Sequence, residues 1–236
     1  MENIDTNYSN GKMLYEKLVD GTVDIIISKE PAEEELEYAQ QKEVEIEYFP
    51  IAIDPFVFYT STENEVDNIS LEEIQQIYSG KITKWSEIGG TDEHIRAFQR
   101  NKNSENQNGM ISLVMQEIEM MKPITEEKNN DENIPVDIVS AYDNAVNSLG
   151  YSFYSYAKSV YNQDGEETIL DGIKILKINN ITPSYSNFQS ELYPLKQVYY
   201  VAIRKTAQES TKVVRDAMLS NRGKLVAKEA GYVTPK

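Results

Sequence analysis

SLEEIQQIYSGKITKWSEIGGTDEHIRAFQRNKNSENQNG, residues 70–109, carries the strongest local signals in the chain. Ser70 and Glu73 match a capping box, in which the side chain of each residue bonds the backbone N–H of the other, and they predict the start of a short helix. A tight turn is expected next around Trp85, the single tryptophan of the sequence. The pattern then predicts a short strand at residues 95–98, a long polar loop and a second helix.

The polar loop combines groups that bind oxyanions. Arg100 offers a planar guanidinium and Ser104 a hydroxyl, and small and amide side chains surround both. Because the loop leads from a strand to a helix N-terminus, its backbone N–H groups are expected to converge with these two side chains. A capping loop with a surface arginine is the alternative interpretation, and the residues by themselves leave it open.

Five segments resemble, in order, the phosphate-binding (PstS-like) solute-binding proteins of ABC importers. They are IYSGKITKWSEIGG (77–90), the QR-x-x-x-S loop (99–104), LGYSFYSYA (149–157), NITPSYSNFQSELYPL (180–195) and KEAGYV (228–233). The resemblance implies an α/β, two-lobed type II periplasmic-binding-protein fold. It implies a substrate-binding component of an ABC-type importer that binds phosphate or a related small oxyanion between the lobes. The alternative is a degenerate or truncated relative without high-affinity anion binding, acting as a sensor or interaction module.

The resemblance also implies where the lobes divide. Residues 1–53 and 198–236 are expected to form a discontinuous first lobe, and residues 54–197 a second lobe inserted between hinge strands. Family members have a first strand ahead of the region that this sequence matches. The first lobe is therefore expected to be incomplete at its N-terminus.

The sequence before residue 70 also contains patterns that predict strands. Residues 23–27 (VDIII) are interpreted as an apolar strand of the kind that is buried on both faces of a parallel sheet. If a neighbouring strand is lacking, apolar faces of this strand are expected to be poorly covered, which favours self-association. Residues 44–48 and 50–59 predict two further strands, the second with a proline-marked kink.

The expected ligand residues of the second lobe lie in the loop. Arg100 and Ser104 match the family pattern R-x-x-x-S-G-[ST], whereas Glu105 and Asn106 stand where that pattern has Gly and Ser or Thr. A carboxylate at position 105 repels a dianion unless it points away.

The first lobe contributes weaker candidates. Ser28, Ser9 and Asn10 occupy positions similar to ligand positions in the family. Phosphate binders commonly have an aspartate two residues after the corresponding strand, but this chain reads Ser28-Lys29-Glu30. Without that acceptor the site need not discriminate phosphate from sulfate-like ions.

Composition narrows the possible functions. The chain has 23 Lys and Arg against 39 Asp and Glu, so its net charge of −16 argues against nucleic acid as a partner. One local guanidinium can still attract an anion, because distant charges are screened beyond roughly 10 Å. The sequence contains no cysteine, which excludes thiol catalysis and disulfides.

No enzymatic activity and no cofactor or metal are expected. His94, the only histidine, lies in a polar turn and has no obvious catalytic partner. The acids Glu33 to Glu35 are interpreted as a solvated helix start rather than a metal site. Trp85 is expected to be a packing anchor, and Tyr151 could either pack or wall a cleft.

The resemblance implies an extracytoplasmic, cell-surface or periplasmic location and an ABC transporter permease as partner. The N-terminal residues show neither a basic n-region nor an apolar h-region. Contact with the membrane is therefore expected only through the transporter, or through a lipid anchor that this chain lacks.

Overall fold

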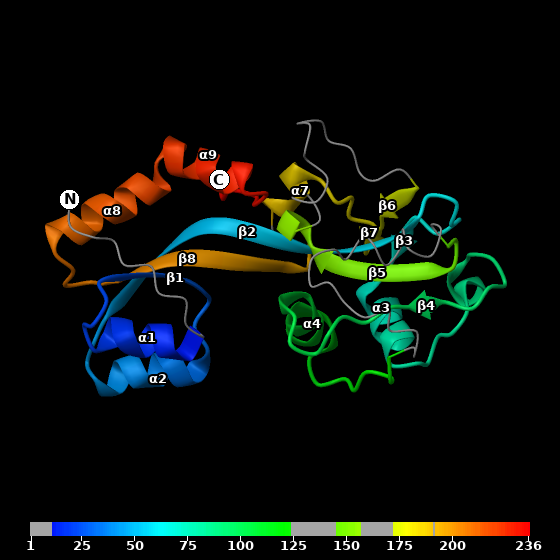
Figure 1. The fold of residues 1–236 in the computed structure, drawn as a ribbon, viewed down its shortest axis with the longest axis horizontal. Helices are drawn as coiled ribbons and strands as arrows, with labels where there is room; N and C mark the ends of the chain where they lie inside the picture. Colours follow the sequence, from blue (N-terminus) through cyan, green and yellow to red (C-terminus); the bar gives the residue numbers. More distant parts are fainter. Residues whose placement is uncertain (1–10, 124–144, 157–171, 191) are drawn as a thin grey trace. The chain divides into compact units, whose positions relative to one another are not determined.

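The computed structural model describes residues 11–123, 145–156, 172–190 and 192–236, which form two compact units (Figure 1). Unit 1 comprises the described residues up to Ile53 together with Gln197–Glu229 and Thr234–Lys236. Unit 2 comprises the described residues of Asp54–Lys196 together with Ala230–Val233. None of the helices in these ranges is long and apolar enough to cross a membrane.

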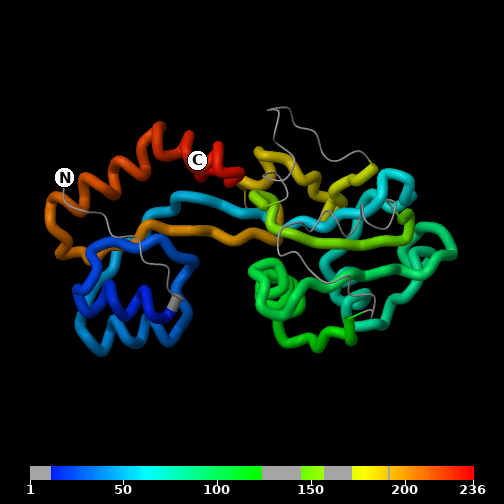
Figure 2. Tube along the Cα trace, viewed as in Figure 1, coloured from blue at the N-terminus to red at the C-terminus, as the bar shows by residue number. Residues whose placement is uncertain are grey.

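Unit 1 joins the beginning and the end of the sequence (Figure 2). Its strands are β1 (Ile25–Lys29), the first half of β2 (Ile46–Ser61) and most of β8 (Lys196–Arg204), in the order β1-β8-β2. Its helices are α1 (Gly11–Val19), α2 (Glu33–Gln41), α8 (Glu209–Leu219) and α9 (Asn221–Glu229).

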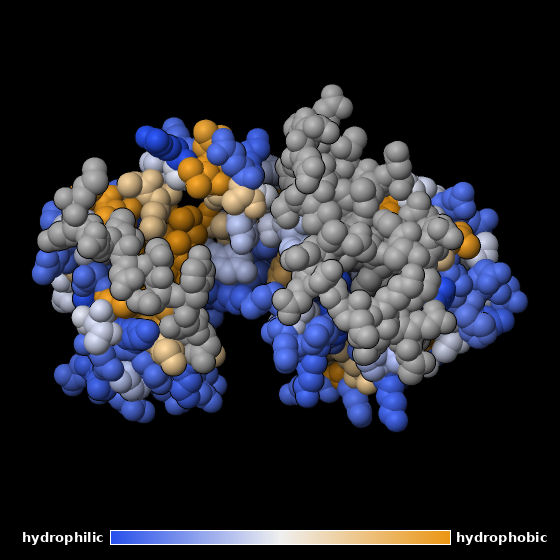
Figure 3. All heavy atoms as spheres, in the orientation of Figure 1, coloured by the Kyte–Doolittle hydropathy of each residue, from blue (hydrophilic) through white to orange (hydrophobic). Residues whose placement is uncertain are grey.

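Two apolar clusters form the core of unit 1. Tyr15 and Leu18 of α1 pack on Ile26 of β1, and Met218 of α8 packs on a separate cluster that contains Val201. On the face shown in Figure 3, further hydrophobic side chains gather around α8 and α9. Val213, Leu225 and Val226 are the exposed large hydrophobic residues of these two helices.

Strand β1 differs from the sequence prediction. It runs antiparallel to β8, from Ile25 opposite Ile203 to Lys29 opposite Tyr199, and within the described residues it lies at the edge of its sheet. Ile27 is 50% exposed, so the strand is not buried on both faces. The prediction of a parallel strand buried on both faces was wrong, because an apolar run does not show which neighbours a strand will have.

The two strands predicted at residues 44–48 and 50–59 are a single strand. β2 runs without interruption from Ile46 to Ser61. Pro50 lies in its exposed part, where a missing ladder hydrogen bond costs little. The division between the units falls within this strand, after Ile53.

Unit 2 is built around the second half of β2. This half pairs antiparallel with β5 (Ser148–Phe153) and β6 (Ile173–Ile175), and β5 pairs in parallel with β4 (Arg96–Ala97). A second small sheet joins β3 (Asn68–Ile69) and β7 (Lys177–Ile178). The helical segments are α3 (Leu71–Tyr78), η1 (Trp85–Ile88), α4 (Glu105–Gly109), the π-helix η2 (Met110–Met115) and α7 (Tyr185–Phe188).

The capping box that begins α3 is confirmed. Ser70 Oγ accepts from Glu73 N at 3.1 Å, and Glu73 Oε2 accepts from Ser70 N at 2.7 Å. Gly80 follows the helix with a φ of 80°, a conformation that glycine adopts at little cost. Trp85 is fully buried, and its indole N–H donates to Asn147 O at 3.0 Å, so its predicted role as a packing anchor is confirmed.

Aromatic side chains fill the core of unit 2. Phe56 and Phe58 of β2 contact Tyr151 of β5 at ring-centroid distances of 5.6 and 6.0 Å. Tyr78 of α3 contacts the same ring at 5.5 Å. Since Tyr78 and Tyr151 are almost completely buried, this cluster forms a rigid base for the loop that follows β4.

Candidate anion-binding site

The candidate site is the loop between β4 and α4 in unit 2. Phe98 N donates to Leu149 O at 3.0 Å, which extends the pairing of β4 with β5 by one step. Tyr78 Oη donates to Phe98 O and Leu149 O at 3.2 and 3.3 Å. These hydrogen bonds therefore hold the backbone at Phe98, two residues before Arg100.

Arg100 is held through its backbone. Its N–H lies 3.0 Å from Gln107 Oε1 and 3.1 Å from Tyr151 Oη, and both oxygens accept from it. Its Nε is buried and has no hydrogen-bond partner within the described residues. A buried cationic donor without an acceptor is costly, because it has lost its contacts with water and gained none in return.

Ser104 caps α4. Its Oγ accepts from Gln107 N at 3.1 Å, and its own N–H donates to Asn101 O at 2.9 Å. A serine hydroxyl both accepts and donates. Capping uses only its acceptor capacity, so the hydroxyl proton can still be donated to an anion at the helix start.

Asn106 and Glu105 differ in their surroundings. Asn106 is 7% exposed, and its Oδ1 accepts from Phe153 N at 2.9 Å, so its side-chain oxygen ties α4 to β5. Glu105 is exposed. Burial raises the pKa of Tyr232, and the carboxylates of Asp54 and, more weakly, Glu105 raise that pKa further.

This electrostatic effect relates Glu105 to the C-terminal segment of unit 2. Its charge reaches the Tyr232 hydroxyl, and Tyr232 belongs to the C-terminal segment of unit 2. Asp54, whose charge also raises the pKa of Tyr232, is 3% exposed and accepts from Ser155 N at 2.9 Å. The loop therefore has negative charge beside it as well as the guanidinium.

Tyr151 remains protonated at ordinary pH. Burial raises the pKa of its hydroxyl, and its contacts with Arg100 offset only part of that effect. Tyr151 Oη donates to Gln107 Oε1. The prediction left two uses open for this residue, and the structure shows a buried packing residue whose hydroxyl supports the loop.

Of the three first-lobe candidates, Ser28 lies within the described residues. Ser28 belongs to unit 1, where its Oγ donates to Tyr15 Oη at 2.8 Å and to Lys29 O at 3.0 Å. It is 7% exposed. Ser9 and Asn10 lie outside the described residues. Within unit 2, the four candidates lie together in the loop and at the start of α4.

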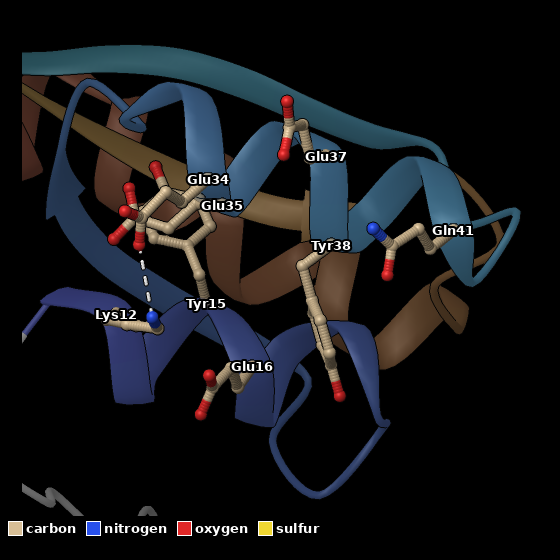
Figure 4. A pocket seen from close by; sticks show the side chains of 8 residues that line it. All are labelled: Lys12, Tyr15, Glu16, Glu34, Glu35, Glu37, Tyr38 and Gln41. Atoms are coloured by element: carbon tan, nitrogen blue, oxygen red, sulfur yellow. Dashed lines mark hydrogen bonds and ion pairs between the residues drawn. The ribbon is translucent and has the colours of Figure 1, made fainter.

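Unit 1 also contains a pocket of about 160 Å³ between α1 and α2 (Figure 4). Four glutamates line it together with Lys12, namely Glu16, Glu34, Glu35 and Glu37. The Lys12 ammonium points to Glu34, 3.1 Å away. This pocket does not suit an oxyanion, because carboxylates outnumber cations. Within the described ranges, no group of three or more acidic or histidine side chains could hold a metal ion.

A family comparison agrees with this arrangement. The model of the PBP superfamily domain matches residues 15–221. The chain belongs to the PBP superfamily. Its fold is that of the type II periplasmic binding proteins, as the sequence resemblance predicted.

Individual relatives of this PBP superfamily protein are phosphate-binding proteins. Phosphate-binding protein PstS of Staphylococcus aureus is 28% identical over 228 residues, which cover 93% of this chain and 65% of that protein. The chain thus spans slightly less than two thirds of the length of that relative.

Solved structures show the same fold. The crystal structure of PstS from Borrelia burgdorferi has a TM-score of 0.74 at 23% identity, covering 98% of this chain and 87% of that one. An ABC-type phosphate transport receptor from Vibrio cholerae has a TM-score of 0.73 at 20% identity, covering 94% and 84%. The predicted resemblance to PstS-like proteins is confirmed.

Sequence reasoning missed the part played by Gln107. Ser104 and Gln107 fit the capping-box pattern S-x-x-Q, which was a usable signal. In a complete box the glutamine would bond the N–H of Ser104. Here its side chain bonds the N–H of Arg100 instead, and only the folded loop shows that partner.

Proposed function

We propose that this PBP superfamily protein is the substrate-binding component of an ABC-type importer and that it binds phosphate or a related small oxyanion. Arg100 supplies charge and directed N–H donors, Ser104 supplies a hydroxyl, and the start of α4 supplies backbone N–H groups. Units 1 and 2 serve as the two lobes, and Ser28 is a contribution from unit 1. A permease is the partner, and the location is extracytoplasmic.

The observation that carries this proposal is the buried Nε of Arg100, which lacks a hydrogen-bond partner within the described residues. A bound oxyanion would satisfy this donor and neutralise the charge at once. The names of the relatives support phosphate as the first anion to test. Glu105 argues for a weaker preference for dianions than Gly at that position would give.

Isothermal titration calorimetry with phosphate, sulfate, molybdate and tungstate tests the proposal. We expect at least one anion to bind with a micromolar or tighter dissociation constant, about −8 kcal/mol. Arg100→Ala should weaken that binding by a hundredfold or more, on the order of 3 kcal/mol. Lys102→Ala is the matched control, because it removes one positive charge from the same loop at an exposed position.

Two results would refute the proposal. One is the absence of binding heat with every anion from protein shown by circular dichroism to be folded. The other is unchanged affinity in Arg100→Ala. An effect of Lys102→Ala as large as that of Arg100→Ala would show that the anion responds only to the general charge of the loop.

A further inference from the structure

Gln107 connects the two main candidate ligands. Its backbone N donates to Ser104 Oγ at 3.1 Å, and its side-chain Oε1 accepts from Arg100 N at 3.0 Å. The residue is 5% exposed. A single buried side chain thus links the start of α4 to the residue that carries the guanidinium, seven positions earlier.

The orientation of the Gln107 amide follows from its neighbours. Two donors, Arg100 N–H and Tyr151 O–H, face its Oε1. Its Nε2 lies 3.5 Å from Met120 Sδ, a weak acceptor. Turning the amide over would place an NH₂ group against the Arg100 N–H, which can only donate. The oxygen is therefore fixed toward Arg100.

Tyr151 closes the network. Its hydroxyl accepts from Arg100 N at 3.1 Å and donates to Gln107 Oε1. It needs its proton for that donation, and burial keeps the hydroxyl protonated by raising its pKa. The three groups form a closed and buried set in which Gln107 Oε1 accepts from both of the others, so its displacement takes the acceptor in this set away from the Tyr151 hydroxyl proton.

We propose that Gln107 is a positioning residue of the anion site: it fixes Arg100 through its side chain and Ser104 through its backbone, so that the guanidinium and the hydroxyl meet an oxyanion at a set spacing. This inference rests on the proposed function. The inference goes beyond the proposed function, because it assigns the geometry of the site to a residue that is not itself expected to contact the anion. Preorganised donors bind more tightly, because less conformational freedom is lost on binding.

Gln107→Met tests the inference, with Gln75→Met as the matched control. Methionine keeps the length of the side chain and removes the amide. Gln75 is also partly buried in unit 2, where its Nε2 donates to Val114 O at 2.8 Å. Inorganic phosphate is the probe, titrated by calorimetry. We expect Gln107→Met to weaken phosphate binding about tenfold or more, and Gln75→Met to leave it unchanged.

A second measurement separates positioning from loss of structure. The Nε–H resonance of Arg100, followed by nitrogen-15 NMR, should shift on phosphate addition in the wild-type protein. In Gln107→Met this shift should be reduced at equal phosphate concentration, while the melting temperature stays close to that of Gln75→Met. If Gln107→Met does not fold, Gln107→Asn replaces it, because its amide is one methylene too short to reach Arg100.

The outcomes distinguish the two proposals. Wild-type protein that is folded but does not bind phosphate or the other anions overturns the proposed function, and the inference with it. Binding that requires Arg100 but is unaffected by Gln107→Met overturns the inference alone. Equal weakening by Gln107→Met and Gln75→Met also overturns it, because the effect would then reflect general destabilisation of unit 2.

Discussion

Replacing Tyr78 with phenylalanine removes one buried hydroxyl and keeps the aromatic ring. The hydroxyl is shared between Phe98 O at 3.2 Å and Leu149 O at 3.3 Å, and the residue is completely buried. Leu149 O also accepts from Phe98 N at 3.0 Å. The substitution therefore leaves Leu149 O with a donor and takes the tyrosine hydroxyl away from Phe98 O.

The magnitude follows from these contacts. A typical hydrogen bond contributes about 1 kcal/mol net, and an acceptor left buried without a partner adds about 1 kcal/mol more. No cavity forms, because the ring keeps its contact with Tyr151. We therefore expect Tyr78→Phe to lower the free energy of unfolding by about 1–2 kcal/mol. For a protein of this size, that corresponds to roughly 2–8 °C in melting temperature.

Urea denaturation followed by circular dichroism measures this difference, and Tyr38→Phe is the control. The Tyr38 hydroxyl donates to Asp20 at the surface, where its loss should cost less than about 0.5 kcal/mol. If Tyr78→Phe proves as stable as the wild-type protein, the buried hydroxyl does not support the loop. An equal effect of both variants would contradict the argument from burial.

Three further predictions concern pH, charge and the sheet edge. Burial raises the pKa of Tyr15 to about 12 and raises the pKa of Tyr78 well above its usual range. Because both folded-state values exceed the unfolded value of about 10, the stabilisation is complete below pH 10 and is lost as pH rises through the folded values. Denaturation at pH 8–12 should show stability falling above pH 10, by up to about 1.4 kcal/mol per pH unit for each tyrosine; constant stability would contradict this. Glu105→Gln should tighten phosphate binding about threefold to tenfold at low salt, and unchanged calorimetric affinity would show that this carboxylate faces away from the anion. Ile27→Lys should reduce concentration-dependent association in light scattering, because a lysine on an edge strand opposes pairing; a wild-type protein that stays monomeric at high concentration would refute this.

Local sequence signals predicted the structure of residues 70–109 well. The capping box at Ser70 appears where the sequence placed it, and a helix, α4, follows the polar loop as predicted. Each depends on hydrogen bonds between residues three positions apart, so a few neighbouring side chains suffice to specify it. The burial of Trp85 could also be predicted, because a large apolar ring gains most by leaving water.

Strand neighbours could not be predicted in this way. The apolar run that contains Ile27 fits a central strand as well as an edge strand, and only the pairing of β1 with β8 decides between them. The continuity of β2 through Pro50 likewise depends on the tertiary structure. Proline has no backbone N–H, so the strand can continue through it only where no neighbouring strand needs that donor.

The sequence by itself determined the order of the elements, the net charge of −16 and the Arg-x-x-x-Ser loop with its family resemblance. The tertiary structure decided which groups hold that loop. Gln107 and Tyr151 are 44 residues apart, and Arg100 and Tyr151 are 51 apart. Hydrogen bonds over such separations form only after packing has removed water and aligned donor with acceptor. For this reason residue types predict candidate ligands, whereas the packed chain sets the contacts that hold their loop.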